Sequence, residues 1–398
     1  MISERMKKLV GGSSAIRAMF EEGNRLAALY GRENVYDFSL GNPNFPAPEK
    51  VQKAIVDVLS EEESTFVHGY MPNAGFPDVR AAVAADLNTR YGTNYSADNV
   101  LMTVGAAGGL NTILCTILNP GDEVLTISPY FVEYGNYVTN HGGVLRAVPS
   151  LEGSFLPDLD ALAEAIGPRT RAVLINNPNN PTGVVYDRDT CSALGAMLER
   201  RSKELGIEIC LLSDEPYREL CYDGTEVPWL PSCYKNTVVC YSWSKSLSLP
   251  GERIGYLLIP SEMDGFSDVW SAACIANRML GFVNAPSLMQ RAVARCLDAK
   301  ADVDAYDKNR KLLYGKLTEL GFSCVYPRGA FYLWMKAPGG DDKAFSDKAK
   351  AYNLLLVPGS SFAGPGWVRM AYCVSPDMIE RSLPAFAKLA EECGLHAV

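Results

Sequence analysis

The sequence predicts an α/β protein with a mostly parallel sheet and a second, smaller α+β domain. Between residues 100 and 260, short apolar runs alternate with helical stretches, a pattern typical of a sheet covered by helices on both faces. After residue 286 this alternation is lost, and helices and strands follow one another irregularly. The chain has 398 residues, and single cores stop growing at roughly 250 to 300 residues. Two domains are therefore expected.

The spacing of apolar residues predicts the individual elements. The helices expected before the sheet cover 15–29, 51–59 and 77–90, and a short strand begins at Asp37. The sheet strands are expected at 100–104, 123–127, 171–175, 208–212, 237–242 and 254–259, with helices at 109–118 and 188–205. The C-terminal part is expected to contain helices at 287–299, at 303–320 and from 376, strands at 322–326, 330–335 and 368–374, and a further segment at 353–358.

Composition narrows the class of ligand. The chain carries 37 basic and 46 acidic residues, a net charge of −9, which disfavours nucleic acid and anionic membranes as partners. The N-terminus lacks the apolar segment of a secretory signal, and no apolar run is long enough to span a membrane. The eleven cysteines include no Cys-x-x-Cys pair and the three histidines have no metal-ligand spacing. We expect reduced thiols, a cytoplasmic protein, no metal and a small-molecule ligand.

Lys245 follows the apolar run 238–242, which is typical of a buried strand. Ligand crevices in α/β proteins form at the carboxyl ends of such strands. Burial and a nearby cation such as Arg253 would lower the lysine pKa from its ordinary value of about 10.4 and produce an amine that forms imines. The alternative interpretation is a solvated charge at the edge of the sheet.

Two further motifs follow predicted strands. Asp214 and Tyr217 come after 208–212, where a carboxylate can pair with a cationic ring nitrogen and a phenol can donate to a ring oxygen. Asp214 as a helix N-cap is the alternative. The segment 176–183 reads Asn-Asn-Pro-Asn-Asn-Pro-Thr-Gly. Its two prolines exclude a helix and hold the asparagine amides rigidly at the sheet edge.

Residues 103–109 read Thr-Val-Gly-Ala-Ala-Gly-Gly and form a predicted small-residue loop between a strand and a helix. Small side chains allow backbone N–H groups to approach a phosphate at the positive end of a helix dipole. Close packing of the strand against the helix is the alternative. The loop matches neither the dinucleotide-binding glycine pattern nor the P-loop, so neither nucleotide motif is inferred.

Together, from about residue 38 to residue 374, these motifs resemble the class I and II aminotransferases, the fold type I enzymes that depend on pyridoxal 5′-phosphate. The resemblance implies a seven-stranded, mostly parallel sheet in a large cofactor-binding domain over 47–285. It also implies a small α+β domain formed by both chain ends, 1–46 and 286–398. A homodimer is implied as well, because Tyr70 matches a tyrosine that reaches the phosphate in the partner subunit's site.

The same resemblance implies roles for single residues. Lys245 looks like the lysine that forms the Schiff base with the cofactor and moves the proton between the substrate Cα and the cofactor C4′. Asp214 matches the acid that keeps the pyridine nitrogen protonated, and Tyr217 and Asn180 match the pair that binds the ring oxygen. Phe131 matches the aromatic residue that stacks on the ring. The phosphate would be bound by Gly105, Ala106, Ala107, Ser242, Ser244 and Arg253.

Substrate contacts are implied in the same way. Arg369 matches the arginine that binds the α-carboxylate through two parallel hydrogen bonds, a task for guanidinium rather than ammonium. Gly41, in Gly41-Asn42-Pro43, looks like part of the loop that closes over that carboxylate, and Asn180 also faces the substrate. An arginine on a surface strand is otherwise a solvated charge.

The preferred substrate side chain is not fixed by these motifs. Some aspartate-specific relatives carry a lysine in the phosphate loop, where this chain has Ala107. Another branch uses a partner-subunit arginine shortly before an Asn-Pro-Pro segment, and here Met279 lies at about that place with Arg278 beside it. These departures weaken a preference for dicarboxylates without excluding it.

The expected function is therefore transfer of the amino group of an α-amino acid to a 2-oxo acid, by a ping-pong mechanism through a Lys245 Schiff base with pyridoxal phosphate. A C–S β-lyase on the same fold is the nearest alternative, because the same lysine and ring also support elimination. A cofactor-binding regulatory module is a third possibility. The roughly 35 residues before Tyr36 are too few and insufficiently basic for a DNA-binding extension.

Overall fold

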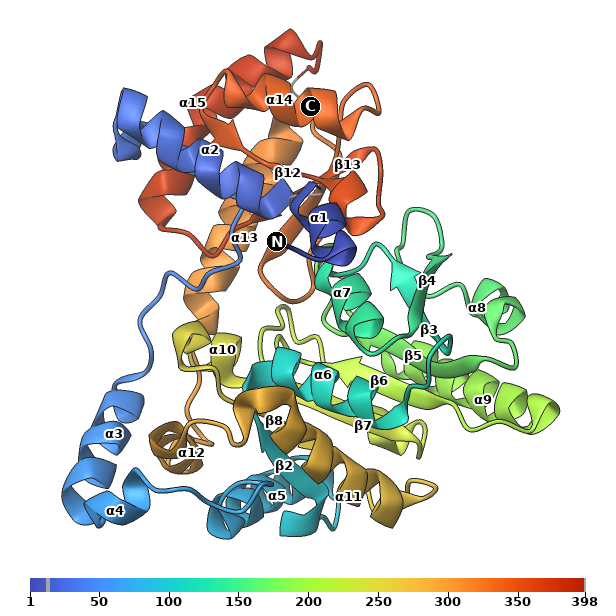
Figure 1. Cartoon of the computed structure of the whole chain (residues 1–398). Coiled ribbons are helices and arrows are strands. Elements are labelled where there is room, and N and C mark those ends of the chain that lie inside the picture. Colours follow the sequence, from blue (N-terminus) through green and yellow to red (C-terminus); the bar gives the residue numbers. More distant parts are fainter. Residues whose placement is uncertain (12–14, 397–398) are drawn as a thin grey trace.

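The computed structural model describes residues 1–11 and 15–396. Figure 1 shows two assemblies, an open sheet flanked by helices and a smaller group of helices and strands that contains the first and last parts of the chain. The two assemblies meet above the sheet edge at which α10 (Trp243–Ser246) lies. Among the described residues no helix has the length and apolar character needed to cross a membrane.

The open sheet has seven strands, which confirms the α/β fold class. All neighbouring strands pair in parallel except β8, which is antiparallel to both β2 and β7. In spatial order the strands are β2 (Val100–Thr103), β8 (Gly255–Leu258), β7 (Thr237–Ser242), β6 (Cys210–Asp214), β5 (Thr170–Asn176), β3 (Glu123–Ser128) and β4 (Val144–Pro149).

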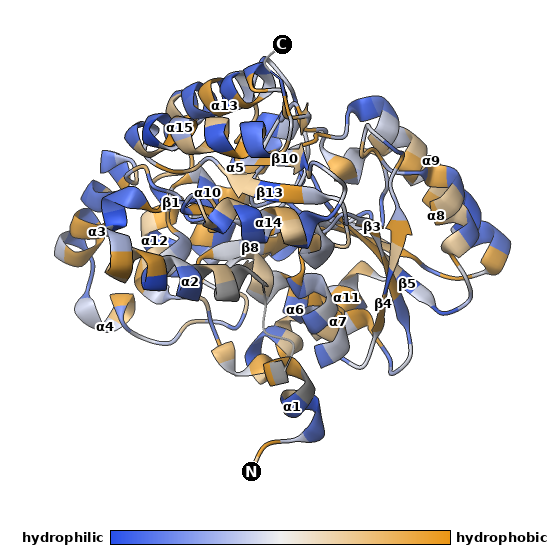
Figure 2. Cartoon of the chain, turned by 90° about the horizontal axis from the view of Figure 1, so that it is seen from above, coloured by the Kyte–Doolittle hydropathy of each residue, from blue (hydrophilic) through white to orange (hydrophobic). Residues whose placement is uncertain are grey.

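Successive side chains of a buried strand point to opposite faces of the sheet, so both faces are apolar. Helices cover both faces and form a core on each. Val124 packs in one core with α6 (Gly105–Ile117), α7 (Glu133–Asn140) and α11 (Phe266–Asn277). Its neighbour Leu125 packs in the other. The helices of that second core are α8 (Leu159–Ala165) and α9 (Arg188–Leu205). Hydrophobic residues accordingly run along β3 and β5, while α9 carries both kinds (Figure 2).

A third core lies at the β2–β8 edge. It contains residues of α3 (Glu49–Glu61), α5 (Pro77–Tyr91) and α12 (Ser287–Ala294), and α4 (Ser64–Val67) lies between α3 and α5 in the chain. Helix α5 ends at Gly92, which has the left-handed backbone conformation that glycine adopts without strain. Although α12 follows residue 285, it packs against α3 and α5. The exact division of the chain into two domains stays a prediction.

The smaller assembly contains a four-stranded antiparallel sheet and a two-stranded parallel one. The first has the order β12 (Val357–Pro358), β13 (Trp367–Ala371), β10 (Tyr332–Lys336) and β9 (Cys324–Val325), and the second pairs β1 (Tyr36–Asp37) with β11 (Leu354–Leu355). The helices around them are α2 (Ala15–Tyr30), α13 (Val303–Glu319), α14 (Asp342–Lys350) and α15 (Pro376–Glu392). Helix α1 (Glu4–Gly11) projects from the body in Figure 2.

The structure differs from the sequence predictions at β4, α6 and α12, and several other strand ends move by one to three residues, so that β6 ends at Asp214. Strand β4 was not predicted, because most of its residues are exposed or half-buried at the sheet edge and they form no continuous apolar run. Helix α6 begins at Gly105 rather than at residue 109, so most of the predicted small-residue loop is its first turn. Helix α12 ends at Ala294 rather than at 299.

A buried ion pair joins the segment after β6 to the smaller assembly. Arg310, on α13, has a fully buried side chain and donates to both carboxylate oxygens of Asp223, at 2.8 and 2.9 Å. It also donates to the carbonyl of Pro327 at 2.7 Å and lies over the rings of Tyr222 and Tyr326. The Arg310 guanidinium holds the pKa of Asp223 at about 2.

Replacing Asp223 tests the contribution of this pair to stability. We expect Asp223→Asn to lower the free energy of unfolding by about 2 kcal/mol at neutral pH, because it removes one of the two carboxylates, Asp223 and Asp307, that pair with the buried Arg310 guanidinium. An unfolded aspartate titrates near pH 3.9, so the stabilisation is complete above that pH and is lost as the pH falls toward 2. Urea denaturation from pH 7 to 2.5 measures this. The difference between the two proteins must shrink on acidification, whereas the exposed Asp160→Asn serves as a control with little effect at any pH.

Candidate active site

A cavity of about 290 Å³ lies between the carboxyl ends of the sheet strands and the smaller assembly. Asn176 and Asp214 end β5 and β6 in register with one another, and Ser242 ends β7 beside them. A larger cavity of about 630 Å³ lies near the start of β6. Its Arg171 is paired with Asp122, and its Asp264 is paired with a lysine, so the smaller cavity is the better candidate.

The candidate cavity brings together most of the residues selected from the sequence. Those that line it are Gly41, Ala106, Ala107, Phe131, Asn180, Asp214, Tyr217, Ser242, Ser244, Lys245, Arg253 and Arg369. Gly105 lies directly behind the lining, against Arg253. Tyr70 is the exception, since it is 94% exposed on the surface of the chain.

Lys245 lies on the short helix α10, which begins where β7 ends because the Ser242 side chain accepts a hydrogen bond from the Ser244 N–H and caps the helix. Its Nζ donates to the carbonyl of Gly41 at 2.7 Å. Burial, with a smaller contribution from the cations Arg253 and Arg369, lowers the pKa of Lys245 to about 8. Roughly a tenth of this amine is therefore uncharged at pH 7, far more than for an ordinary lysine, and the uncharged form is the one that acts as a nucleophile.

Asp214 is buried and only one of its carboxylate oxygens has a partner. Tyr134 donates to Oδ2 at 2.6 Å, whereas Oδ1 has no hydrogen bond within the described residues. Burial raises the pKa of Asp214 to about 7, and the neighbouring Glu215 adds to the rise while the Tyr134 bond opposes it. An unpartnered buried carboxylate oxygen is costly unless a ligand supplies a donor or a cation.

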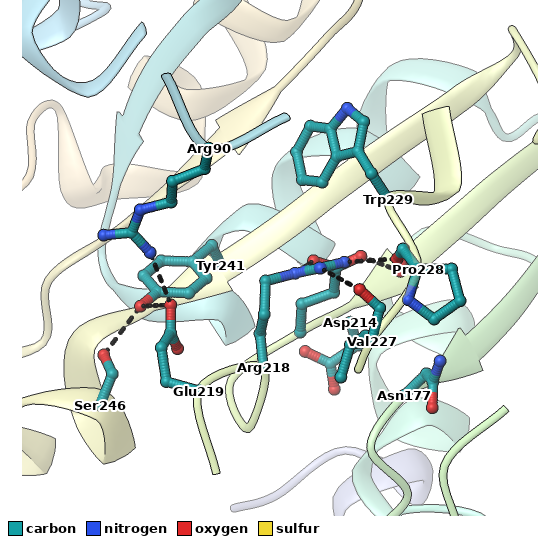
Figure 3. A network of polar contacts seen from close by, with 12 residues as sticks. Arg90, Asn177, Asp214, Arg218, Glu219, Val227, Pro228, Trp229, Tyr241 and Ser246 are labelled. Carbon is teal, nitrogen blue, oxygen red and sulfur yellow. Dashed lines mark hydrogen bonds and ion pairs between the residues drawn. The ribbon is translucent and has the colours of Figure 1, made fainter. Parts of the chain in front are cut away.

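Glu215 lies next to Asp214 but its charge is neutralised. Arg218 donates to its carboxylate, and this guanidinium also donates to the carbonyls of Val227 at 3.1 Å and Pro228 at 3.0 Å (Figure 3). It lies over the ring of Trp229. Arg218 is thus committed to holding Glu215, and Asp214 remains the carboxylate available to a ligand.

Arg369, on β13, is 2% exposed and no carboxylate pairs with it in the described part of the chain. Its Nη2 donates to the carbonyl of Ser39 at 2.6 Å and its Nη1 to Asn180 Oδ1 at 3.1 Å, while its Nε has no partner. Its guanidinium lies between the rings of Tyr332 and Phe362, at 4.5 and 4.6 Å. A buried guanidinium with donors to spare is a site for an anion.

The opposite side of the cavity can bind a second anion. Helix α6 starts there, and the backbone N–H groups of its first turn have no partners within the helix. The hydroxyls of Ser242 and Ser244 lie 2.6 Å apart, close to Arg253. Gly105 has φ of +68°, and a Cβ atom there would lie 2.8 Å from Arg253 Nη2. A side chain at this position would strain the backbone and displace that guanidinium, so glycine suits it.

Three tyrosines of this site were missed from the sequence. Tyr332 and Tyr137 line the cavity, and Tyr134 holds Asp214 from behind. Tyr332 lies in the predicted strand 330–335, where it was given no role, and Tyr134 and Tyr137 lie in a stretch for which no element was predicted. No sequence signal separates a core aromatic residue from one whose hydroxyl faces a cavity.

Of the positions that could contact the substrate side chain, one lines the cavity and two lie outside it. Ala107 lines the cavity. Arg278 and Met279 instead begin a turn of π-helix, Arg278–Phe282, which does not line the cavity, and Met279 is 67% exposed. Within the described residues, this chain's own cavity contains no further cation beyond Lys245, Arg253 and Arg369.

The seven-stranded sheet and the cavity at its carboxyl edge define an α/β protein with a small-molecule site. The chain belongs to the class I and II aminotransferases, since residues 33–386 match this family. It is therefore an aminotransferase that depends on pyridoxal 5′-phosphate and acts on amino acids and 2-oxo acids.

Named relatives agree with this assignment. The probable aspartate/prephenate aminotransferase of Thermus aquaticus is 33% identical over 87% of this chain and 89% of its own length, and the aspartate aminotransferase of Pyrococcus horikoshii is 29% identical over 98% and 97%. Among solved structures, an aminotransferase from Eubacterium rectale is 46% identical with a TM-score of 0.96, over 98% of this chain and 99% of that one. The aspartate aminotransferase of Thermus thermophilus with maleate has a TM-score of 0.86 at 30% identity, with the same coverage.

The polar groups of the cavity fit pyridoxal phosphate. The free Oδ1 of Asp214 can pair with a protonated ring nitrogen, and the hydroxyl of Tyr217 can donate to a ring oxygen. The start of α6, with the serines and Arg253, suits a phosphate. The unpaired Arg369 leaves a cation for a substrate carboxylate.

The depressed pKa of Lys245 can be measured in protein freed of its cofactor. Only the uncharged amine reacts with formaldehyde in reductive methylation, so the rate of labelling at Lys245 is expected to reach half its maximum at about pH 8. Peptide mass spectrometry at pH 6 to 11 follows this rate, with the exposed Lys300 as the internal reference. Labelling of Lys245 that reaches half its maximum only near pH 10.5, the ordinary lysine value, would contradict the effect of burial on its pKa.

Proposed function

We propose that the amino group is transferred in the cavity around Lys245, with Lys245 as the residue that binds the cofactor covalently. One observation carries this proposal: three buried polar groups line the same cavity. They are the Lys245 amine, whose pKa is lowered, the Asp214 carboxylate, one oxygen of which has no hydrogen bond, and the Arg369 guanidinium, which has no carboxylate partner. Each of these groups is costly to bury without a ligand, and the three together suit a cationic ring and a carboxylate.

The roles of the other residues follow from their positions. We assign Asp214 to the ring nitrogen, Tyr217 and Asn180 to the ring oxygen, and Phe131 to the face of the ring. The phosphate is assigned to the start of α6, with Gly105, Ala106, Ala107, Ser242, Ser244 and Arg253. Arg369 is assigned to the α-carboxylate, with Asn180 and Gly41 on either side.

When bound, pyridoxal phosphate supplies a carbonyl carbon that takes up the amino group and a ring that stabilises negative charge at the substrate Cα. Lys245 Nζ, once released from the cofactor, takes the proton from Cα as a general base. Arg369 holds the substrate so that this proton faces Nζ. Asp214 retains its charge because a cation beside it offsets the burial that otherwise raises its pKa.

We further propose a homodimer in which Tyr70 contributes to the partner's site. Several large apolar side chains of α4 and of the turn 278–282 are exposed, which favours a covered surface: Phe66 at 50%, Met279 at 67% and Phe282 at 46%. Tyr70 lies beside the last of these, at a small surface cavity. If Met279 and Arg278 face the partner's cavity, a distal carboxylate would meet Arg278 there.

Two further assignments belong to this proposal. We place the boundary of a large domain at about 47–285, with both chain ends in a small domain, because all strands of the seven-stranded sheet lie within this range and all strands of the two smaller sheets lie outside it. We also assign the protein to the cytoplasm, because all eleven cysteines are free thiols and none forms a disulfide.

Absorption spectroscopy with single amino acids tests the reaction. In the absence of a 2-oxo acid, a donor is expected to convert the cofactor spectrum to that of its amine form in one stoichiometric turnover, because the first half-reaction needs no acceptor. The amino acids that cause the change define the donor class, including whether aspartate belongs to it. Release of pyruvate with an unchanged cofactor spectrum would indicate β-elimination instead.

Lys245→Ala is expected to bind the cofactor and lose all turnover, and a normal rate in that variant would refute the role of Lys245.

Arg369→Leu tests the assignment of the carboxylate contact. Because the α-carboxylate is common to all amino acids, we expect kcat/KM to fall about 100-fold or more for every donor, mainly through KM. Steady-state kinetics with an acidic, an aromatic and an aliphatic donor provide the comparison. A loss confined to one donor would make Arg369 a reader of side chains.

A further inference from the structure

Tyr332 makes a contact with Tyr217 that the functions proposed above do not explain. The two hydroxyl oxygens lie 2.9 Å apart, and both side chains are buried, with exposures of 3% and 6%. Neither hydroxyl has another hydrogen-bond partner within the described residues. Tyr332 also lines the cavity and lies close against the Gly41 backbone, where an added Cβ would be 2.0 Å from its hydroxyl oxygen.

The ring of Tyr332 has a second function. Tyr332 is paired across the β10–β13 ladder with Ala371, so it lies diagonally from Arg369 on the same face of the sheet. The Arg369 guanidinium lies over its ring at 4.5 Å. One side chain therefore contacts both the tyrosine assigned to the ring oxygen and the arginine assigned to the substrate carboxylate.

The direction of the Tyr217–Tyr332 hydrogen bond follows from counting protons. Two hydroxyls share one contact, so one proton lies in the contact and the other is free. If Tyr217 donated to Tyr332, its proton would be occupied and could not reach a ring oxygen in the cavity. If Tyr332 donates, the Tyr217 proton is free to point into the cavity, and accepting a bond makes Tyr217 a stronger donor.

We infer that Tyr332 is a positioning residue, whose hydroxyl donates to Tyr217 and directs the Tyr217 proton at the cofactor's ring oxygen, and whose ring supports Arg369. This inference rests on the proposed placement of Tyr217 against that oxygen. The charged or titratable groups that act on the pair are Arg369, Asp214 and Cys373. Burial raises the pKa of Tyr332 to about 12, so its hydroxyl keeps its proton through the working pH range.

The first test follows the absorption of the bound cofactor as a function of pH, without substrate. The quantity measured is the midpoint, the pH at which half of the absorption change has occurred. A donor to the ring oxygen stabilises negative charge there and so lowers this midpoint. Tyr332→Phe removes only the hydroxyl, and we expect the midpoint to rise by about 0.5 to 1 unit. Tyr217→Phe is expected to raise it further. The double variant is expected to match Tyr217→Phe alone, because Tyr332 acts through Tyr217.

The second test is expected to shift the midpoint in the opposite direction, with a side chain of almost the same size and shape. 3-Fluorotyrosine at position 332 is a more acidic hydroxyl and a stronger donor, so the midpoint is expected to fall. The matched control is Tyr372→Phe, which removes another buried hydroxyl of the same core, one that donates to the Ala330 carbonyl at 3.1 Å. This control is expected to lower stability and leave the midpoint in place.

The third test separates the ring from the hydroxyl. Tyr332→Leu removes the surface beneath Arg369, and we expect KM to rise several-fold for every amino acid, whereas Tyr332→Phe leaves KM near that of the wild type.

The failures are distinguishable. An unmoved midpoint in Tyr217→Phe refutes the placement of Tyr217 and the inference with it. A shift in Tyr217→Phe with none in Tyr332→Phe or the fluorotyrosine variant refutes the inference alone. Additive shifts in the double variant would also refute it, since they mean that Tyr332 acts independently of Tyr217.

Discussion

The active site depends on buried charged groups that the protein does not itself neutralise. Lys245 and Arg369 lie in the cavity without carboxylate partners, and Asp214 has one oxygen unsatisfied. Such groups oppose folding, so the surrounding structure must be stable enough to hold them. The three cores of the larger assembly and the aromatic core of the smaller one provide that stability. The Glu215–Arg218 pair has a different function, since it removes one negative charge from the vicinity of Asp214.

The geometry of the site follows from the sheet. Parallel strands bring their carboxyl ends to one edge, so residues far apart in the chain, such as Asn176, Asp214 and Ser242, become neighbours. The smaller assembly covers this edge and contributes Arg369 and Tyr332 from adjacent antiparallel strands. The reacting groups therefore come from two bodies, and their separation depends on how these bodies pack.

Much of this was predictable from the sequence, and the reasons for success and failure are physical. Buried strands such as 237–242 form apolar runs that end in polar residues, so both the strand and Lys245 were found. Strand β4 was not found because an edge strand needs no apolar run. Tyr332 and Tyr134 were not found because a hydroxyl at the tip of an aromatic ring leaves no trace in a hydrophobic pattern. The position of Tyr70 was predicted only through the family resemblance, and its function depends on a second chain.

The strip Ser39–Gly41 has a consequence for the affinity of the site. Its main-chain oxygens already accept bonds from the cations that a substrate needs: the Ser39 carbonyl from Arg369 and the Gly41 carbonyl from Lys245. A carboxylate that takes over a proton now bonded to one of these carbonyls gains only the difference between two contacts, whereas the unpartnered Nε of Arg369 offers it a new contact. The Ser39 and Gly41 carbonyls therefore reduce the net free energy that the substrate gains on binding. A ping-pong enzyme releases one product before the second substrate enters the same cavity, and modest binding allows that turnover.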